Sequence, residues 1–265
     1  MGKSKLILIT GGSSGIGKAA AKHLVKEGHE VIIQARNNEK LVKAANEIDP
    51  TGKAVSYYST DLSDLASVKT SAIEIVNEHG VPDVIINSAG AGEWLSFKEA
   101  TAEHFIDTIN SPYLATAFTC KVFFDKMQNR NNGHFIIVNS VACYVPIPGA
   151  VGYGSARSAM LGFAKALQSD LHDSNFDVSI ISLGKVASPY FSNNPVSEER
   201  IPKAVSLLVP TMSESEAGNA VAGIVHSKKL TVIKPNMMNF LIFLNRFIPG
   251  IFRWLMRKTG YRSRD

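Results

Sequence analysis

Seven short runs of β-branched and aliphatic residues alternate with helix-length amphipathic segments along most of the chain. The central runs, such as VIIQ at 31–34 and DVIIN at 83–87, are continuously apolar and do not alternate with polar residues. Strands of this kind are covered by helices on both faces, which is typical of a parallel sheet. The pattern therefore predicts an α/β fold with one doubly wound parallel sheet. The expected strands are 5–9, 30–34, 54–59, 83–87, 134–139, 178–183 and 229–233, and the expected helices are 15–28, 38–48, 64–79, 101–129, 151–173 and 213–227.

A glycine-rich turn follows the first expected strand and reads TGGSSGIG at 10–17. Gly11, Gly15 and Gly17 supply a tight turn, a close backbone approach and tight packing of a helix on a strand. The helix that follows presents free N–H groups and the positive end of its dipole to a pyrophosphate. Because a strand precedes the turn and a helix follows it, we expect a Rossmann-like dinucleotide site. The residues expected to bind the cofactor here are Gly11, Ser13, Ser14, Gly15, Ile16 and Gly17.

Two alternatives exist for the same segment. Residues 11–15 also match G-x-S-x-G, the nucleophile elbow of α/β-hydrolases. That elbow follows several strands, whereas this turn follows the first one, so a hydrolase is disfavoured. A glycine-rich turn without a ligand is the other alternative.

The second expected strand ends in Gln34-Ala35-Arg36 and lacks the acidic residue that accepts hydrogen bonds from the ribose of NAD. The Arg36 guanidinium can pair with a 2′-phosphate. We therefore expect NADP(H) as the cofactor. A solvated arginine at the start of a helix is the alternative interpretation of Arg36.

Charge and cysteine content exclude several classes of protein. The chain has 28 basic and 23 acidic residues, and residues 245–265 hold six of the basic ones and one acid. The other 244 residues are therefore neutral in sum, and a nucleic-acid-binding body is disfavoured. Two cysteines without a CxxC pair predict neither a disulfide framework nor a metal site, and they favour an intracellular compartment.

Several motifs, in order, resemble the short-chain dehydrogenase/reductase family over about residues 4–233. The loop at 10–17 is similar to the family's cofactor loop, and residues 87–90 (NSAG) are similar to its Asn-Ala-Gly motif. Ser140 and Tyr153 match its catalytic serine and tyrosine at the family's separation. The resemblance implies a catalytic set of Asn110, Ser140, Tyr153 and Arg157, and a cofactor-binding set that adds Asp61, Leu62, Asn87, Ala89, Gly90, Tyr153, Arg157, Gly184, Val186 and Ser188 to Arg36 and the glycine loop.

The sequence departs from the family pattern at two positions. The family's Tyr-x-x-x-Lys has Arg157 where the lysine stands, and its Pro-Gly after the sixth strand is Leu183-Gly184. We expect little effect from Leu183, because the backbone contacts there do not need proline.

Reduction of a ketone needs a hydride and a proton for the developing alkoxide. Tyr153 and Arg157 are spaced i and i+4, so both project from one helix face, where a cation favours the phenolate. Ser140 can donate a hydrogen bond to the substrate oxygen. Arginine does not readily lose a proton and is a poor member of a proton relay. We expect an active but slower enzyme, and a cofactor-binding interaction protein with little turnover is the alternative.

The tail after the last expected strand is densely apolar and basic, and Pro249-Gly250 divides it into two helical pieces. Neither piece is long enough to span a bilayer. Short apolar faces with Trp254 and flanking cations are typical of interfacial membrane helices. We therefore expect residues 236–258 to contact a membrane peripherally. A subunit contact or a cover over the active-site mouth is the alternative.

These observations predict a dehydrogenase/reductase domain over 1–234 and an amphipathic tail over 235–265. The expected activity transfers a hydride between NADP(H) and a hydrophobic or lipid-like ketone, in a chain loosely similar to 3-ketodihydrosphingosine reductases. Hydroxysteroid and 3-oxoacyl reductases are the alternatives. We expect no metal or nucleic acid, a homodimer or homotetramer, and a cytoplasmic location at the cytosolic face of a membrane. Cys143 is expected to be a small apolar filler.

Overall fold

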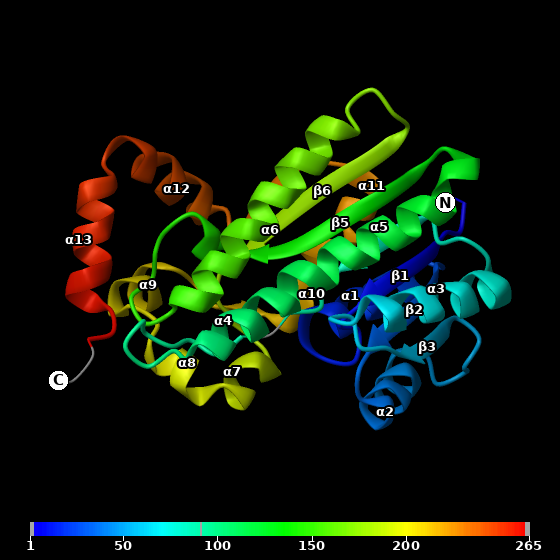
Figure 1. Cartoon of the computed structure of the whole chain (residues 1–265), viewed down its shortest axis with the longest axis horizontal. Coiled ribbons are helices and arrows are strands. Elements are labelled where there is room, and N and C mark those ends of the chain that lie inside the picture. Colours follow the sequence, from blue (N-terminus) through cyan, green and yellow to red (C-terminus); the bar gives the residue numbers. More distant parts are fainter. Residues whose placement is uncertain (1–2, 91, 263–265) are drawn as a thin grey trace.

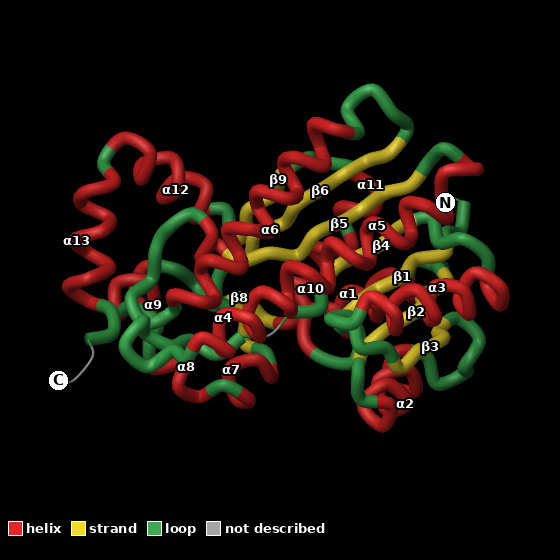
Figure 2. Tube along the Cα trace, in the orientation of Figure 1, coloured by secondary structure: helices red, strands yellow, loops and turns green. Residues whose placement is uncertain are grey.

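The computed structural model describes residues 3–90 and 92–262. In this part of the chain, seven parallel strands form one sheet in the order β3-β2-β1-β4-β5-β6-β9 (Figures 1 and 2). The predicted doubly wound sheet is confirmed, and the strand ends agree with the prediction within two residues. The strands are β1 Leu6–Thr10, β2 Glu30–Ala35, β3 Val55–Ser59, β4 Val84–Asn87, β5 Gly133–Ser140, β6 Phe176–Leu183 and β9 Thr231–Lys234, with a separate short pair, β7 Val186–Ala187 and β8 Met212–Ser213.

Side chains of the central strands alternate between two apolar cores, one on each face of the sheet. In β1, Ile7 and Ile9 pack in the first core and Leu8 packs in the second, as a period of two requires. The continuous apolar runs are thus buried on both faces. The helices of the first core are α1 Gly15–Lys26, α2 Asn38–Ile48, α10 Glu214–Ala222 and α11 Ile224–Ser227. The helices of the second core are α3 Leu65–His79, α5 Ala115–Met127 and α6 Val151–Asp170.

The prediction of one long helix over 101–129 is wrong. The segment contains α4 (Ala102–Ile109), a π-helical turn over Asn110–Leu114, and then α5. Ser111 in the turn has an extended backbone, with φ −134° and ψ 105°. The cause is Pro112, because a proline ring disfavours the helical conformation of the residue before it. The kink turns Ser111 toward the large cleft described below.

Three short helices occupy the segment between β7 and β8, and two longer ones form the tail. Figure 1 shows α9, α12 and α13 together at one end of the molecule, beyond the sheet. The tail helices meet at Pro249, as predicted, and bury Met238, Ile242 and Met256 on their inner faces. The helices are α7 Pro189–Asn193, α8 Pro195–Glu199, α9 Lys203–Leu208, α12 Met237–Phe247 and α13 Pro249–Thr259.

The tail helices are short, and no described helix has the length and apolar content to cross a bilayer. Arg264 and Asp265, which contribute to the charge of the tail, lie outside the described residues.

Candidate active site

A cleft of about 460 Å³ opens at the carboxyl ends of the parallel strands. Its walls are the loops that follow β1, β2, β3, β4, β5 and β6. The strand order reverses between β1 and β4, and a crevice at this position is the usual ligand site of a doubly wound sheet.

The glycine loop forms one wall of the cleft, and two of its glycines leave no room for a side chain. Gly11 has φ +68°, and a Cβ there would lie 2.8 Å from the Cα of Ala89. A Cβ on Gly17 would lie 2.5 Å from the carbonyl oxygen of Gly11. The loop is therefore pressed against the chain after β4 and against the first turn of α1.

The loop leaves the amino end of α1 open to an anion. Ser14 is the N-cap residue, and its side chain makes no capping hydrogen bond. The first turn of α1 has no acidic side chain that would compete for the helix dipole. Gly15 has φ +53° and faces Ser188 across the cleft, where a Cβ would stand 3.7 Å from the Cβ of Ser188. These features fit a dinucleotide pyrophosphate.

The end of the cleft beside β2 and β3 carries basic side chains. Arg36 and Lys40 both line it, and Asn37 caps α2 by accepting a 2.8 Å hydrogen bond from the Lys40 backbone N–H. Asp61 and Leu62 line the same end. Hydrogen bonds from Ser63 hold the pKa of Asp61 below its usual value, and the charge of Arg36 acts in the same direction. The sequence prediction missed Lys40, although its place one turn after Arg36 was a readable signal.

Ser140 and Tyr153 line the opposite end of the cleft. Ser140 closes β5, and its Oγ accepts a 3.2 Å hydrogen bond from the N–H of Ala142. Tyr153 stands on the first turn of α6 and is 7% exposed. The ring of Trp94 lies 5.4 Å from the ring of Tyr153, centroid to centroid. The topology thus brings a residue from β5 and a residue from α6 into one pocket.

Arg157 lies one helical turn after Tyr153 and is 8% exposed. Its guanidinium lies 5.0 Å from the centroid of the Tyr153 ring, and its Nη1 donates a 3.4 Å hydrogen bond to the carbonyl of Val138. Gly90 provides the space for it, since a Cβ on Gly90 would lie 3.1 Å from Nη2 of Arg157. The arginine therefore brings a buried positive charge to the tyrosine ring.

The loop after β6 brings Gly184, Val186 and Ser188 to the cleft. The N–H of Gly184 donates a 2.8 Å hydrogen bond to the carbonyl of Lys234, so the departure at Leu183-Gly184 leaves this loop anchored to β9.

Ala89 and Gly90 line the cleft, whereas the neighbouring Asn87 does not. Asn87 is fully buried behind the wall, where its Nδ2 donates to Sγ of Cys120 at 3.3 Å. Asn110 begins the π-helical turn, and the next residue, Ser111, lines the cleft in its place. The roles of Asn87 and Asn110 stay predictions.

An aromatic wall closes the end of the cleft near Tyr153, and the sequence prediction missed it. Trp94, Tyr190 and Phe191 form the wall together with the Tyr153 ring. The Tyr190 hydroxyl donates a hydrogen bond to the carbonyl of Gly92, and burial raises the pKa of Tyr190. Tyr190 therefore keeps its proton and contributes apolar surface. The aliphatic side chains that extend this wall are Ile147, Ile201, Pro202 and Val205.

Cys143 lies near this site without a role in it. Burial raises the pKa of the Cys143 thiol to about 11, so the thiolate that a nucleophile needs is not formed near neutral pH. This supports the prediction of a small filler.

Tyr261, near the end of the tail, contacts two loops at the rim of the cleft, one with Glu99 and one with Arg200. Arg200 makes a two-pronged ion pair with Glu99, with N–O distances of 2.6 and 2.8 Å. The Tyr261 hydroxyl donates to Glu99 at 2.7 Å, and the Tyr261 ring lies 4.1 Å from the Arg200 guanidinium. Ile201, the next residue, lines the cleft. The predicted alternative that the tail contacts the active-site mouth therefore has structural support.

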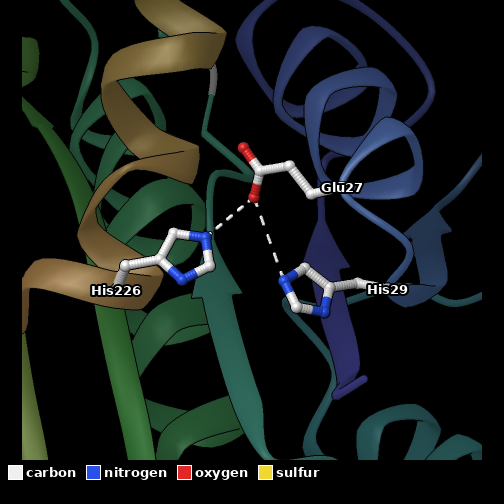
Figure 3. A group of neighbouring side chains, drawn as sticks. All are labelled: Glu27, His29 and His226. Atoms are coloured by element: carbon white, nitrogen blue, oxygen red, sulfur yellow. Dashed lines mark hydrogen bonds and ion pairs between the residues drawn. The ribbon is translucent and has the colours of Figure 1, made fainter. Parts of the chain in front are cut away.

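Glu27, His29 and His226 form a second cluster near the start of β2 (Figure 3). The cluster lies at the amino ends of the strands, whereas the cleft lies at their carboxyl ends. Nε2 of His226 lies 2.8 Å from Oε2 of Glu27, and Nε2 of His29 lies 3.9 Å from it. Nδ1 of His29 accepts a hydrogen bond from the Lys5 N–H, and burial lowers the pKa of His29. The neutral ring therefore carries its proton on Nε2, whereas a metal-bound histidine donates from its other nitrogen. The cluster fits a charge-assisted contact and does not fit a metal site.

The sheet and its cleft define a dinucleotide-binding α/β protein. The sequence model of the short chain dehydrogenase family matches residues 5–199. The chain belongs to this family, which confirms the resemblance found in the sequence.

Curated relatives and solved structures agree with this assignment. An uncharacterized oxidoreductase of Mycobacterium tuberculosis is 29% identical over 230 residues, covering 84% of this chain and 65% of its own. The chain thus spans about two thirds of the length of that relative. Estradiol 17-beta-dehydrogenase 11 of Macaca fascicularis is 25% identical over 255 residues, covering 96% of this chain and 82% of its own.

Two solved structures share the fold. An alcohol dehydrogenase of the archaeon Thermococcus sibiricus, complexed with 5-hydroxy-NADP, has a TM-score of 0.73 and 26% identity, covering 87% of this chain and 94% of its own. A short chain dehydrogenase/reductase of Burkholderia phymatum, in complex with NAD, has a TM-score of 0.83 and 18% identity, covering 99% and 98%. Neighbours of this fold therefore bind either nicotinamide cofactor.

Proposed function

We propose that the chain is an NADP(H)-dependent oxidoreductase that interconverts a hydrophobic ketone and its secondary alcohol. The observation that carries the proposal is the shared cleft: Ser140, Tyr153 and Arg157 line one end, and the glycine loop and Arg36 line the other. Family membership supports the reaction class.

The protein's own groups supply the proton and stabilise the charge. The nicotinamide cofactor, held by the glycine loop, supplies a hydride when bound. The Ser140 hydroxyl donates a hydrogen bond to the carbonyl oxygen of the substrate, and the Tyr153 hydroxyl transfers its proton to that oxygen as negative charge develops there. The phenolate that remains is stabilised by the guanidinium of Arg157 against its ring.

Regeneration of the Tyr153 proton is the step in which Arg157 differs from the family's lysine. A guanidinium stays protonated and does not pass a proton on. Its contacts with the Tyr153 ring and the Val138 carbonyl keep it in place as a fixed charge. This arrangement supports a slower enzyme and also favours a second candidate function, a cofactor-binding interaction protein with little turnover.

The preference for NADP(H) is proposed from two cations at the adenosine end of the cleft. Arg36 and Lys40 line that end, and the loop after β2 carries no acidic side chain there. A 2′-phosphate would meet two positive charges, whereas a free ribose 2′-hydroxyl would find no carboxylate to accept its hydrogen bond from this loop.

The substrate class is proposed from the wall around Tyr153. Trp94, Phe191 and the aliphatic residues beyond them offer apolar surface and few hydrogen-bond partners. This supports a lipid-like ketone of the 3-ketodihydrosphingosine type. A hydroxysteroid is the alternative, supported by the likeness to estradiol 17-beta-dehydrogenase 11, and a 3-oxoacyl substrate is another.

We further propose that the tail over 236–258 contacts a membrane peripherally at its cytosolic face, with the catalytic domain in the cytoplasm. Assembly into a homodimer or homotetramer stays a prediction.

The test of the function is the variant Tyr153→Phe. It removes the proton donor and should lower ketone-dependent NADPH oxidation by roughly 100-fold or more while NADPH binding stays within about twofold. The control Tyr57→Phe makes the same chemical change on the exposed part of β3 and should have no effect. If the wild-type chain binds NADPH but reduces none of a panel of short, steroidal and long-chain ketones, the interaction protein becomes the better assignment.

A further inference from the structure

Large apolar side chains are exposed together on α9, α12 and α13. Leu207 is 87% exposed, Phe247 is 70% exposed and Trp254 is 58% exposed. Figure 1 places these three helices at one end of the molecule, and α13 contacts α9. We call this surface the apolar end; its exposed apolar residues are Leu207, Leu208, Phe240, Phe243, Phe247, Ile248, Ile251 and Trp254.

The exposed and buried residues of the tail lie on different helix faces. Phe240, Phe243 and Phe247 follow the i, i+3, i+7 spacing of one outer face of α12. Met238 and Ile242 lie on the inner face and pack in a small core with Val209. The aromatic face is thus not required for packing within the chain. Exposed apolar surface of this extent marks an interaction site.

The tail part of the apolar end also carries cations, and residues 236–258 contain no aspartate or glutamate. The basic residues of this stretch are Arg246, Arg253, Arg257 and Lys258. All four are exposed, and none takes part in an ion pair formed between residues that the structure describes. Their charges are therefore available to an anionic partner.

The charge distribution disfavours a second copy of this chain as the occupant. In a two-fold symmetric contact the same patch meets itself. Four uncompensated cations from each copy would then face one another without acidic partners from this stretch. An anionic lipid surface satisfies both features, since it takes up aromatic side chains and attracts cations.

Helix α9 links the apolar end to the catalytic cleft. Pro202, the N-cap residue of α9, and Val205 within it line the cleft, and Leu207 and Leu208 at the end of the same helix are exposed. A surface that takes up these leucines would therefore lie beside the aliphatic wall of the cleft.

We propose that the apolar end docks on an anionic bilayer and that the cleft takes its ketone directly from that bilayer. Leu207 and Leu208 enter the lipid together with the tail aromatics, and Arg253 and Arg257 meet the headgroups. The docking does not depend on the reaction, whereas the uptake of a ketone from lipid rests on the function proposed above.

Vesicle flotation of the full chain tests the docking. We expect binding to vesicles of phosphatidylcholine with phosphatidylserine, much weaker binding to phosphatidylcholine alone, and loss of binding at high salt. The double variant Arg253→Gln/Arg257→Gln should weaken partitioning roughly 30-fold. Leu207→Ser and Trp254→Ser should each weaken it on both kinds of vesicle. The matched controls are Lys69→Gln and Ile73→Ser, an exposed cation and an exposed apolar residue on α3.

Activity assays distinguish the docking from the reaction. With a water-soluble ketone, the wild type and these variants should turn over equally with or without vesicles. With a long-chain ketone held in anionic vesicles, Leu207→Ser and Trp254→Ser should lower the rate in proportion to lost binding. A chain that reduces the soluble ketone but binds no anionic vesicle, or that dimerises through Trp254 in size-exclusion runs, overturns the docking. A chain that binds the vesicles but reduces neither ketone overturns the proposed function and the uptake.

Discussion

Arg157 stands where the family pattern has a lysine. It stands on the same face of α6 as Tyr153, and its guanidinium lies against the tyrosine ring. Gly90 leaves the space that the group occupies. Arginine supplies only a positive charge at this position, whereas a lysine there supplies a positive charge and a proton that it can release.

We expect Arg157→Lys to raise ketone-dependent NADPH oxidation at least severalfold. The ammonium retains the charge one turn from Tyr153 and can lose a proton, which arginine does not do readily. Steady-state kinetics at saturating NADPH measure the change. The control Arg130→Lys replaces an arginine that bonds to the carbonyls of Val81 and Pro82, outside the cleft, and should leave the rate unchanged. An unchanged or lower rate for Arg157→Lys would mean that the site is adapted to arginine.

A substitution at Arg36 tests the cofactor preference, also at the scale of a single residue. Arg36→Asp should weaken NADPH binding by about 10- to 100-fold, because a charge-assisted hydrogen bond contributes about 1.5–3 kcal/mol. The same variant should strengthen NADH binding, since the new carboxylate can accept from the ribose hydroxyls. Fluorescence titrations with both cofactors provide the dissociation constants. Lys43→Asp, an exposed charge reversal on α2, is the control, and equal affinities in the wild type would contradict the role of Arg36.

At the scale of elements, two turns shape the cleft. The glycine loop after β1 presses on the chain after β4, and the π-helical turn after α4 directs Ser111 inward. Both turns depend on backbone conformations that particular residues allow: a positive φ at Gly11 and an extended residue before Pro112.

Gly11→Ala should destabilise the protein and abolish tight NADPH binding. Alanine at positive φ costs about 1–2 kcal/mol, and its Cβ would also meet the Ala89 backbone at 2.8 Å. Gly28→Ala is the matched control, because Gly28 also has a positive φ, +88°, but nothing lies within 4 Å of its added Cβ. Urea unfolding should show that Gly11→Ala lowers the free energy of unfolding by about 2 kcal/mol more than Gly28→Ala does. Equal losses would mean that the close approach to Ala89 contributes nothing.

At the scale of the whole molecule, the tail packs in a small core of its own and reaches the rim of the cleft. The tail helix α13 packs on α9, and Tyr261 after it donates a hydrogen bond to Glu99 of the Glu99–Arg200 pair at the cleft rim.

A neutral histidine lies deep in the central sheet. His134 on β5 is 3% exposed, and its Nε2 lies 2.8 Å from Oγ of Ser179 on β6.

The global stability should fall as the pH drops from about 6.5 to about 4. Burial lowers the pKa of His134 from 6.5 to about 4, so the unfolded chain takes up this proton first. Neutral His134 contributes fully to the free energy of unfolding above its pKa in the unfolded chain. This contribution, about 3 kcal/mol in total, is lost as the pH falls toward its pKa in the folded protein. Burial lowers the pKa of His29 as well, which acts in the same direction.

Urea unfolding across this pH range measures the loss, and His134→Gln should show a shallower dependence than the wild type. The exposed His172→Gln is the control and should follow the wild type. Parallel curves for the wild type and His134→Gln would contradict the assignment.

Much of the fold and of the cleft followed from the sequence alone. Continuous apolar runs predicted strands covered on both faces, and the glycine loop between a strand and a helix predicted the dinucleotide crevice. The i, i+4 spacing placed Arg157 beside Tyr153. These features are local in sequence, and local patterns determine period, turns and helix faces.

What the tertiary structure decided depends on contacts between distant segments. Trp94, Tyr190 and Phe191 come together only because the segment that follows β4 meets the segment that follows β6. No helix was predicted over 187–210, because the helices in this segment are too short to display a period. Asn87 matched a motif, yet strand packing buries it behind the cleft wall. Apolar residues of the tail looked alike in sequence, and only packing separated the buried Met238 from the exposed Phe247, because burial depends on which face meets the rest of the chain.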